Sequence, residues 1–255
     1  MKIALLVAYD GTGFNGFARQ PRGRTVQGVL EESLSPLLRV AGRTTGAGRT
    51  DAGVHAAGQV VSFEVPAGTD PERVRFRLNR RLAPELAVRA ARAVPDAFDA
   101  RHSARRRVYD YHLYRYPAPD PFLDRFAVHV AERLNLAAMR RCARALVGEH
   151  DFSSFCRRGE SSLVRRVRSI TVRASPDGRV VVRVTADSFC HQMVRSIVGT
   201  LLEVGAGRRA PEAVGIALRA RDRSAAGAVA PAKGLVLVSV TYPRSPFGRA
   251  SGEGA

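Results

Sequence analysis

The spacing of hydrophobic positions changes along the chain. Some segments have a period of two, which predicts strands, and others have a spacing of three and four residues, which predicts helices. In the first half, apolar runs and period-two alternation predict strands at 2–8, about 40–45, 59–65 and 86–93. Apolar residues three and four apart predict a helix after Thr25, and a second helix is predicted from Asp70 to about Arg80. The order of elements in this half is therefore βαββαβ.

The second half repeats this order. Strands are predicted at 107–115, 169–173, 179–185 and 235–240, with helices at 135–148 and 192–205 and a short inserted helix from Pro211. The same order in both halves predicts an α+β fold of two ferredoxin-like (βαββαβ, RNA-recognition-like) units with their sheets side by side. We expect domains at 1–103 and 104–245, followed by a disordered tail at 246–255.

Local signals set several of these boundaries. Thr25, Asp70 and Asn135 are the predicted N-caps of three helices, because their side-chain oxygens can accept from free amides of the first turn. Pro36 is predicted to kink or end the first helix, and Gly148 to close the helix that starts at Asn135. The sequence Pro-Asp-Gly at 176–178 predicts a hairpin.

Composition narrows the class of protein. The chain has 255 residues, 45% of them hydrophobic, and no apolar run near the roughly 20 residues that span a bilayer. We interpret the apolar N-terminus as a first strand rather than a signal peptide, which predicts a cytoplasmic protein. The three cysteines, Cys142, Cys156 and Cys190, are widely spaced without a Cys-x-x-Cys pair. This argues against a disulfide framework and a zinc site and favours a reducing compartment.

The net charge of +18 is the strongest compositional signal. A charge of this size favours a polyanionic partner, most often nucleic acid. Lys2 and Lys233 are the only lysines, so almost all of the positive charge is arginine. A guanidinium group can bind phosphate in a bidentate way, and the bias toward arginine therefore leaves the prediction of an RNA or DNA partner intact.

The glycine-punctuated run 46–55 places Asp51 two residues after Arg49 and four before His55. A turn would use the same residue types. If the loop is a site, Asp51 can act as a nucleophile or a general base, and Arg49 as its neighbour or a phosphate contact. No cluster with metal-ligand spacing stands nearby, so we predict no metal. His55 is more often structural than catalytic.

Other candidates lie in the second half. Tyr109 and Tyr111 share one face of a strand that follows a basic cluster (Arg101, Arg105, Arg106 and Arg107), a pattern of core packing or of a nucleic-acid groove. The basic run at 157–168 is either a solvated loop or a phosphate clamp. Arg195 lies on an apolar helix, and a carboxylate such as Asp51 would be a suitable partner.

Six blocks of sequence, in a fixed order, resemble the tRNA pseudouridine synthase A family. They are Tyr9-Asp-Gly-Thr, Gly48-Arg-Thr-Asp-Ala-Gly-Val-His with Gly58-Gln-Val-Val, Phe98-Asp-Ala-Arg, Tyr109-Asp-Tyr, Gly148-Glu-His-Asp-Phe-Ser, and His191-Gln-Met-Val-Arg-Ser-Ile-Val-Gly with Glu203-Val-Gly. The block around Asp51 is the most specific of the six.

The resemblance implies an enzyme that isomerises uridine to pseudouridine at positions 38–40 of the tRNA anticodon stem-loop, after base flipping and without a cofactor. By the same resemblance Asp51 is the single catalytic aspartate and Arg49 holds the target nucleotide out of its stack. Tyr109 stacks on the uracil, Arg101 contacts the RNA backbone and Arg195 pairs with Asp51. The resemblance also implies a homodimer whose tRNA lies across both subunits.

The chain departs from the family pattern at three places. Phe17 stands where the family usually has Trp, and Val108 and Asp110 stand beside Tyr109 where basic residues are expected. Two alternatives remain within RNA biology, a non-catalytic RNA-binding module and a pseudouridine synthase acting on another RNA. A phosphate-cradling loop ranks last, because the chain lacks a Gly-Lys-Ser/Thr and Asp51 would repel phosphate.

Overall fold

The computed structural model describes residues 1–38, 43–157 and 162–248, and it is a mixed α+β structure with five α-helices in this part of the chain. Two compact units are present, residues 1–105 with 237–255 (unit 1) and residues 106–236 (unit 2). The division at 105/106 lies close to the expected boundary at 103/104. The last strand differs from expectation, because its residues from Leu237 onward belong to unit 1.

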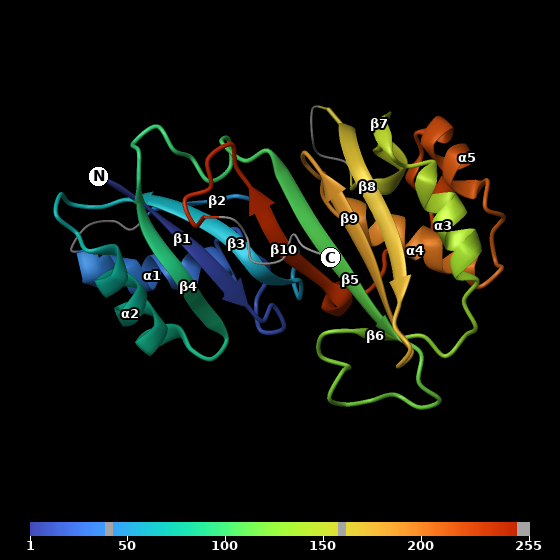
Figure 1. Cartoon of the computed structure of the whole chain (residues 1–255), viewed down its shortest axis with the longest axis horizontal. Coiled ribbons are helices and arrows are strands. Elements are labelled where there is room, and N and C mark those ends of the chain that lie inside the picture. The colour runs from blue at the N-terminus through green and yellow to red at the C-terminus, as the bar shows by residue number, and fades with distance from the viewer. Residues whose placement is uncertain (39–42, 158–161, 249–255) are drawn as a thin grey trace. The chain divides into compact units, whose positions relative to one another are not determined.

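Unit 1 has strands in the order β4-β1-β3-β10. β1 pairs antiparallel with both β4 and β3, and β2 pairs antiparallel with β3. Its elements are β1 (Lys2–Tyr9), α1 (Val26–Leu38), β2 (Thr44–Gly46), β3 (His55–Glu64), α2 (Pro71–Leu82), β4 (Leu86–Val94) and most of β10 (Leu235–Thr241). Both helices lie on one face of this sheet (Figure 1). Leu5, Leu30, Leu34, Val61 and Leu78 are buried in its core.

Unit 2 has antiparallel strands in the order β5-β9-β8-β7, and the short β6 runs parallel to β5. Its strands are β5 (Arg106–Tyr114), β6 (Val128–His129), β7 (Gly148–Asp151), β8 (Val164–Ala174) and β9 (Arg179–Ala186). Its helices are α3 (Leu136–Arg144), α4 (Met193–Gly205) and α5 (Ala213–Ala220), with short 3-10 turns η1 (Ser153–Phe155), η2 (Arg223–Ala225) and η3 (Ala232–Gly234). Tyr111, Val182, Ile197 and Leu201 are in the core.

The three predicted N-caps are confirmed. The Thr25 hydroxyl accepts from the Gly28 amide at 3.2 Å, and the carboxylate of Asp70 accepts from the Glu72 amide at 2.9 Å. The Asn135 side chain accepts from the Ala138 amide at 3.0 Å. The hairpin at 176–178 is confirmed as well, because β8 and β9 pair antiparallel on either side of Gly178, whose φ is +84°.

Two helix ends differ from the predictions. α1 continues through Pro36 to Leu38. α3 ends at Arg144 rather than at Gly148, because the amides of Ala145, Leu146 and Val147 each bond to the carbonyl three residues back. Gly148 instead begins β7 with a φ of +118°. The first residues of the strand expected at 40–45 and most of the expected tail (249–255) lie outside the described residues.

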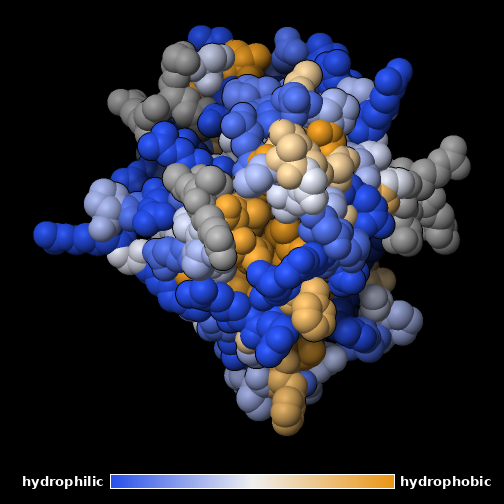
Figure 2. Space-filling model, turned by 90° about the vertical axis from the view of Figure 1, so that its left-hand side faces the viewer, coloured by the Kyte–Doolittle hydropathy of each residue, from blue (hydrophilic) through white to orange (hydrophobic). Residues whose placement is uncertain are grey.

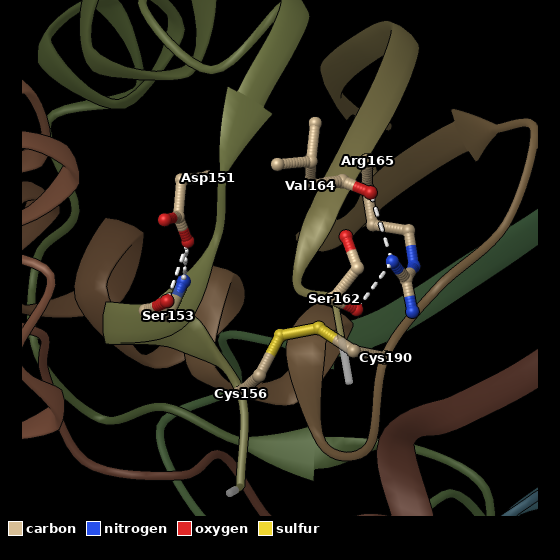
Figure 3. Close-up of a disulfide and its surroundings, with 7 residues drawn as sticks. All are labelled: Asp151, Ser153, Cys156, Ser162, Val164, Arg165 and Cys190. Atoms are coloured by element: carbon tan, nitrogen blue, oxygen red, sulfur yellow. Dashed lines mark hydrogen bonds between the residues drawn. A yellow bond between two sulfur atoms is a disulfide. The ribbon is translucent and has the colours of Figure 1, made fainter. Parts of the chain in front are cut away.

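The sequence argued against a disulfide framework, but one pair of cysteines is bonded. Cys156, after η1, is bonded to Cys190, before α4, and their Cα atoms are 5.8 Å apart (Figure 3). The two cysteines are 34 residues apart in sequence. The β8–β9 hairpin lies between them and returns the chain, so sequence spacing alone gives no sign of the bond. Cys142 is a buried free thiol.

In the oxidised protein we expect one reactive thiol per chain under denaturing conditions without reductant, and three after reduction. Removal of a cross-link that closes a loop of this size lowers stability by about 4 kcal/mol in the chain-entropy model. The midpoint of urea unfolding should therefore fall on reduction. Cys142→Ala is the control and should show the same fall. Three reactive thiols without reductant would contradict the bond.

Candidate active site

Asp51 lies in the loop that joins β2 to β3 in unit 1. Its side chain is half-buried, whereas Arg49 is exposed. Val54 donates its amide to the Asp51 carbonyl at 3.1 Å, and Ala47 donates its amide to Val60 at 2.8 Å. The first bond closes a turn within the loop, and the second ties the start of the loop to β3.

Buried polar side chains hold the loop from within the unit. The Tyr9 hydroxyl and the Thr50 Oγ1 are 2.8 Å apart, and burial raises the pKa of Tyr9 to about 12, although hydrogen bonds to Thr50 and Gln59 oppose this. The fully buried Gln59 amide donates to the Gly48 carbonyl at 2.8 Å and accepts from the Gly48 amide at 3.3 Å. Residues 48 and 50 are therefore fixed on either side of Arg49.

The segment after β1 packs against the other side of the loop. Phe17 donates its amide to the Thr50 carbonyl at 3.0 Å, and Gly53 donates its amide to the Phe14 carbonyl at 3.3 Å. Gly16 has a φ of +93°, and a Cβ there would be 2.8 Å from the Thr50 carbonyl oxygen. Only glycine combines this backbone angle with so close an approach.

His55 is buried and contacts neighbouring backbone, which agrees with the interpretation of this residue as structural rather than catalytic. Its ring is 3% exposed, and its Nδ1 accepts from the Gly11 amide at 3.0 Å. The Asp10 carboxylate is 3.1 Å from the same nitrogen and also accepts from the amide and hydroxyl of Thr12. His55 thus joins the turn after β1 to the start of β3.

Arg101 follows the 95–100 linker in unit 1 and is exposed. The Asp99 carboxylate accepts from the amides of Arg101 and His102 at 2.8 and 2.7 Å. Burial raises the pKa of Asp99, but these hydrogen bonds outweigh it and the net shift is downward. The backbone at Arg101 is therefore held in a turn that presents an exposed guanidinium.

Tyr109 lies in unit 2 on the face of β5 that includes the buried Tyr111 and Leu113. It is 6% exposed, and its ring meets Phe189 edge to face at 5.1 Å. The Tyr109 ring is therefore held in a packed position rather than free to rotate in solvent. Tyr111 is the neighbouring ring on this face, and its hydroxyl donates to the Pro231 carbonyl at 2.8 Å.

Arg195 is in the first turn of α4, and its Nε donates to the Ala230 carbonyl at 2.8 Å. The Ala230 amide returns a bond to the Arg195 carbonyl at 3.1 Å. Arg195 also lowers the pKa of Tyr111 electrostatically, although burial dominates and raises it. Its backbone and side chain are thus both anchored to one segment of unit 2.

Much of the basic run at 157–168 has structural partners. Arg166 pairs with Glu149 at 3.0 Å and Arg168 pairs in a bidentate way with Asp187 at 2.7 Å. Arg165 donates to the carbonyls of Ser162 and Val164 (Figure 3). These bonds favour the structural interpretation of Arg165, Arg166 and Arg168 over a phosphate clamp. Residues 158–161 lie outside the described residues.

Tyr9, Thr50 and Gln59 were absent from the predicted site, although each is tied to the Asp51 loop. One indication for Gln59 was present in the sequence, since it is a polar residue at the start of the predicted apolar strand 59–65. In the described residues, no group of three or more His, Cys, Asp or Glu side chains is placed to hold a metal ion. Nor does any described helix have the length and hydropathy to cross a membrane.

The strong positive charge suits a nucleic-acid partner, and the carboxylate of a loop held by buried side chains suits a general base or a nucleophile. A family model described as tRNA pseudouridine synthase matches residues 5–103 and 142–243. The chain belongs to this family, and it is an isomerase that acts on tRNA.

Close relatives match over nearly the whole chain. A tRNA pseudouridine synthase A of Bacillus velezensis is 42% identical over 246 residues, which cover 95% of this chain and 99% of the relative. The protein of that name from Bacillus subtilis is 41% identical with the same coverage. The one from Ralstonia nicotianae is 45% identical over 249 residues, 95% of this chain and 90% of its own.

The contact between Tyr9 and Thr50 should matter for turnover. Thr50→Val removes the hydroxyl without changing the volume, and it should lower kcat about tenfold, the effect of 1.4 kcal/mol, with KM for tRNA unchanged. Thr50→Ser keeps the oxygen and should restore kcat.

Ser154→Ala is the matched control, because it removes another buried hydroxyl bond, to the Ala217 carbonyl at 2.6 Å in unit 2. Each variant should be assayed by steady-state kinetics and thermal unfolding. Equal kcat losses in Thr50→Val and Ser154→Ala would show that the hydroxyl contributes to folding alone.

Proposed function

We propose that the protein isomerises uridine to pseudouridine at positions 38–40 of the tRNA anticodon stem-loop, with Asp51 as its catalytic carboxylate. The observation that carries this proposal is the fixed loop. The bonds to Gly48 and Thr50 hold the backbone on both sides of Arg49 and next to Asp51. Such rigidity is what a positioned nucleophile or base requires, because small displacements of a reacting group lower the rate strongly.

The proposed reaction begins with extrusion of the target nucleotide, because a stacked base is out of reach of a side chain. Arg49, exposed two residues before Asp51, holds the extruded nucleotide. The Asp51 carboxylate then acts on the nucleoside either as a nucleophile or by abstracting a proton. The bond between N1 of the uracil and C1′ of the ribose breaks, the uracil turns, and C5 forms a new bond to C1′. C5 then loses its proton and N1 gains one, so the product has the composition of the substrate. The rearrangement is redox-neutral.

The other predicted site residues have supporting roles in this proposal. Tyr109 stacks on the uracil, and the edge-to-face contact with Phe189 fixes the orientation of its ring. Arg101 contacts the RNA backbone from an exposed turn. Arg195 pairs with Asp51 and so balances its charge.

We also propose that both units are ferredoxin-like. In unit 1 the order β4-β1-β3, with β2 beside β3 and helices on one face, agrees with a βαββαβ unit. In unit 2 the corresponding elements are β5, α3, β8, β9 and α4. Unit 1 supplies the catalytic loop in this proposal, and unit 2 supplies Tyr109 and Arg195 for binding RNA.

Asp51→Asn should remove activity while leaving the fold intact, since it deletes the charge and keeps the shape. We expect pseudouridine formation in transcribed tRNA to fall at least about a thousandfold, which corresponds to about 4 kcal/mol of lost barrier reduction. Binding of tRNA should be retained. Asp96→Asn, at a carboxylate that is 83% exposed, is the control and should be fully active.

Pseudouridine is mapped at single-nucleotide resolution after incubation with each variant. Continued modification by Asp51→Asn would contradict the catalytic role. If the wild-type protein binds tRNA but does not isomerise uridine, the result would favour a non-catalytic RNA-binding module. Modification confined to another RNA would favour a different substrate.

We further propose that the protein acts in the cytoplasm as a homodimer, with one tRNA in contact with both subunits. Sedimentation at assay concentrations should give a mass of twice the 27.6 kDa of one chain. Addition of one tRNA per dimer should not dissociate it. A mass of 27.6 kDa under conditions of full activity would contradict the dimer.

A further inference from the structure

Helix α2 of unit 1 carries an unusual concentration of arginine. Five of its 12 residues are arginines, at 73, 75, 77, 80 and 81, and Glu72 is its one acid. Val74, Leu78 and Leu82 form the buried stripe, so the helix is amphipathic and its arginines lie outside the core. Arg73, Arg77 and Arg80 are exposed together with Phe76, and we call these four residues the α2 patch.

Phe76 lies within the α2 patch with 61% of its surface exposed. The guanidinium carbon of Arg80 is 6.0 Å from the centroid of its ring, at the outer limit of a cation–π contact. Arg73 is three residues before Phe76 and Arg80 is four after it, which are the spacings of neighbours on a helix surface. An accessible aromatic ring is thus surrounded by guanidinium groups.

Within the part of the chain that the structure describes, the charge of the α2 patch is not neutralised by neighbouring carboxylates. Glu72 is engaged by Arg75 at 2.6 Å and by Arg92 at 2.8 Å, and hydrogen bonding from Arg75 is the main reason that the pKa of Glu72 is lowered. Among the described residues, no carboxylate pairs with Arg73, Arg77 or Arg80. Arg73 and Arg77 are four residues apart, an unfavourable spacing for like charges.

Arginines of the unit 2 sheet behave differently. Arg183 pairs in a bidentate way with Asp110 at 2.7 Å, and Arg168 does so with Asp187. These arginines form ion pairs within the sheet, whereas the arginines of the α2 patch face solvent. The face of the molecule that Figure 2 shows is largely hydrophilic, with one hydrophobic area near its centre and other hydrophobic residues among the polar ones.

Helix α2 leads along the chain and through its packing to the end of unit 1 that carries Asp51. β4 follows α2, and its first residue, Leu86, pairs with Tyr9, which in turn contacts Thr50. A cavity of about 230 Å³ lies between the C-terminal end of α2 (Arg81 and Leu82) and Phe14, whose carbonyl binds the Gly53 amide. Phe76 is six residues before Leu82, about 9 Å along the helix axis. A tRNA held at Asp51 is much longer than this.

We propose that the α2 patch is a second RNA-docking surface, which binds the sugar-phosphate backbone of the tRNA away from the target nucleotide. Arg73, Arg77 and Arg80 contact phosphates, and Phe76 lies under an unstacked base or ribose. Guanidinium groups interleaved with an accessible aromatic ring are the chemistry of non-sequence-specific RNA binding. This inference rests on tRNA as the substrate and is independent of the role of Asp51.

The test compares two double variants with equal loss of charge. Arg77→Gln/Arg80→Gln changes the α2 patch, and Arg141→Gln/Arg144→Gln changes two exposed arginines in the last turn of α3. Binding of full-length tRNA is measured at several salt concentrations. For the α2 double variant we expect about a tenfold loss of affinity at low salt. The slope of log K against log salt should become shallower by about two, one for each lost phosphate contact.

The α3 double variant should keep the wild-type slope. Phe76→Ala should weaken binding without changing the slope, because it removes stacking but no charge. The rate of a single turnover at saturating enzyme should be unchanged in all of these variants, which separates docking from chemistry. Thermal unfolding confirms that each variant is folded.

Equal losses in the α2 and α3 double variants would show that net charge alone matters and would overturn the proposal. A wild-type affinity and slope for the α2 double variant would overturn it as well. The effect should persist in an Asp51→Asn background, so a failure of the catalytic proposal would not alter this result.

Discussion

The buried polar contacts under the Asp51 loop are the constraint on which the site depends. Tyr9 and Gln59 belong to neighbouring strands, and between them they engage Thr50 and Gly48. A buried polar group that loses its partner destabilises the fold by about 1–3 kcal/mol, so the loop cannot shift without breaking bonds in the sheet. The position of the carboxylate is thus coupled to the register of β1 and β3. A change that shifts this register would therefore also shift the Asp51 carboxylate.

A net charge of +18 suggests at first that the whole surface is made for RNA. The structure divides the arginines into two groups. One group is structural and includes Arg166, Arg168 and Arg183, which pair with carboxylates across adjacent strands of unit 2. The pairs of Arg166 and Arg168 are half-exposed and each adds little stability, but all three pairs remove charge from the sheet. The remaining exposed arginines therefore concentrate the attraction for RNA in fewer places.

The sequence predicted those features of the fold that depend on local chemistry. The caps at Thr25, Asp70 and Asn135 and the hairpin at Gly178 follow from residues within a few positions of one another. Features that depend on long-range pairing were missed. The polar four-residue strand β7 forms only because β8 lies beside it. The Cys156–Cys190 bond depends on the return of the β8–β9 hairpin. Tyr9 and Gln59 join the site through the β1–β3 register, which no local pattern reveals.

Two departures from the family pattern are compensated by contacts in their immediate surroundings. Phe17, in place of the usual Trp, is buried against Gly46, where a Cβ would collide with its ring. The Phe17 ring fills this space beside the loop, and a small side chain in its place would leave a void. Asp110 would repel RNA phosphates near Tyr109, but it is almost fully buried and Arg183 binds both of its oxygens. The charge of Asp110 is therefore neutralised within the sheet by Arg183.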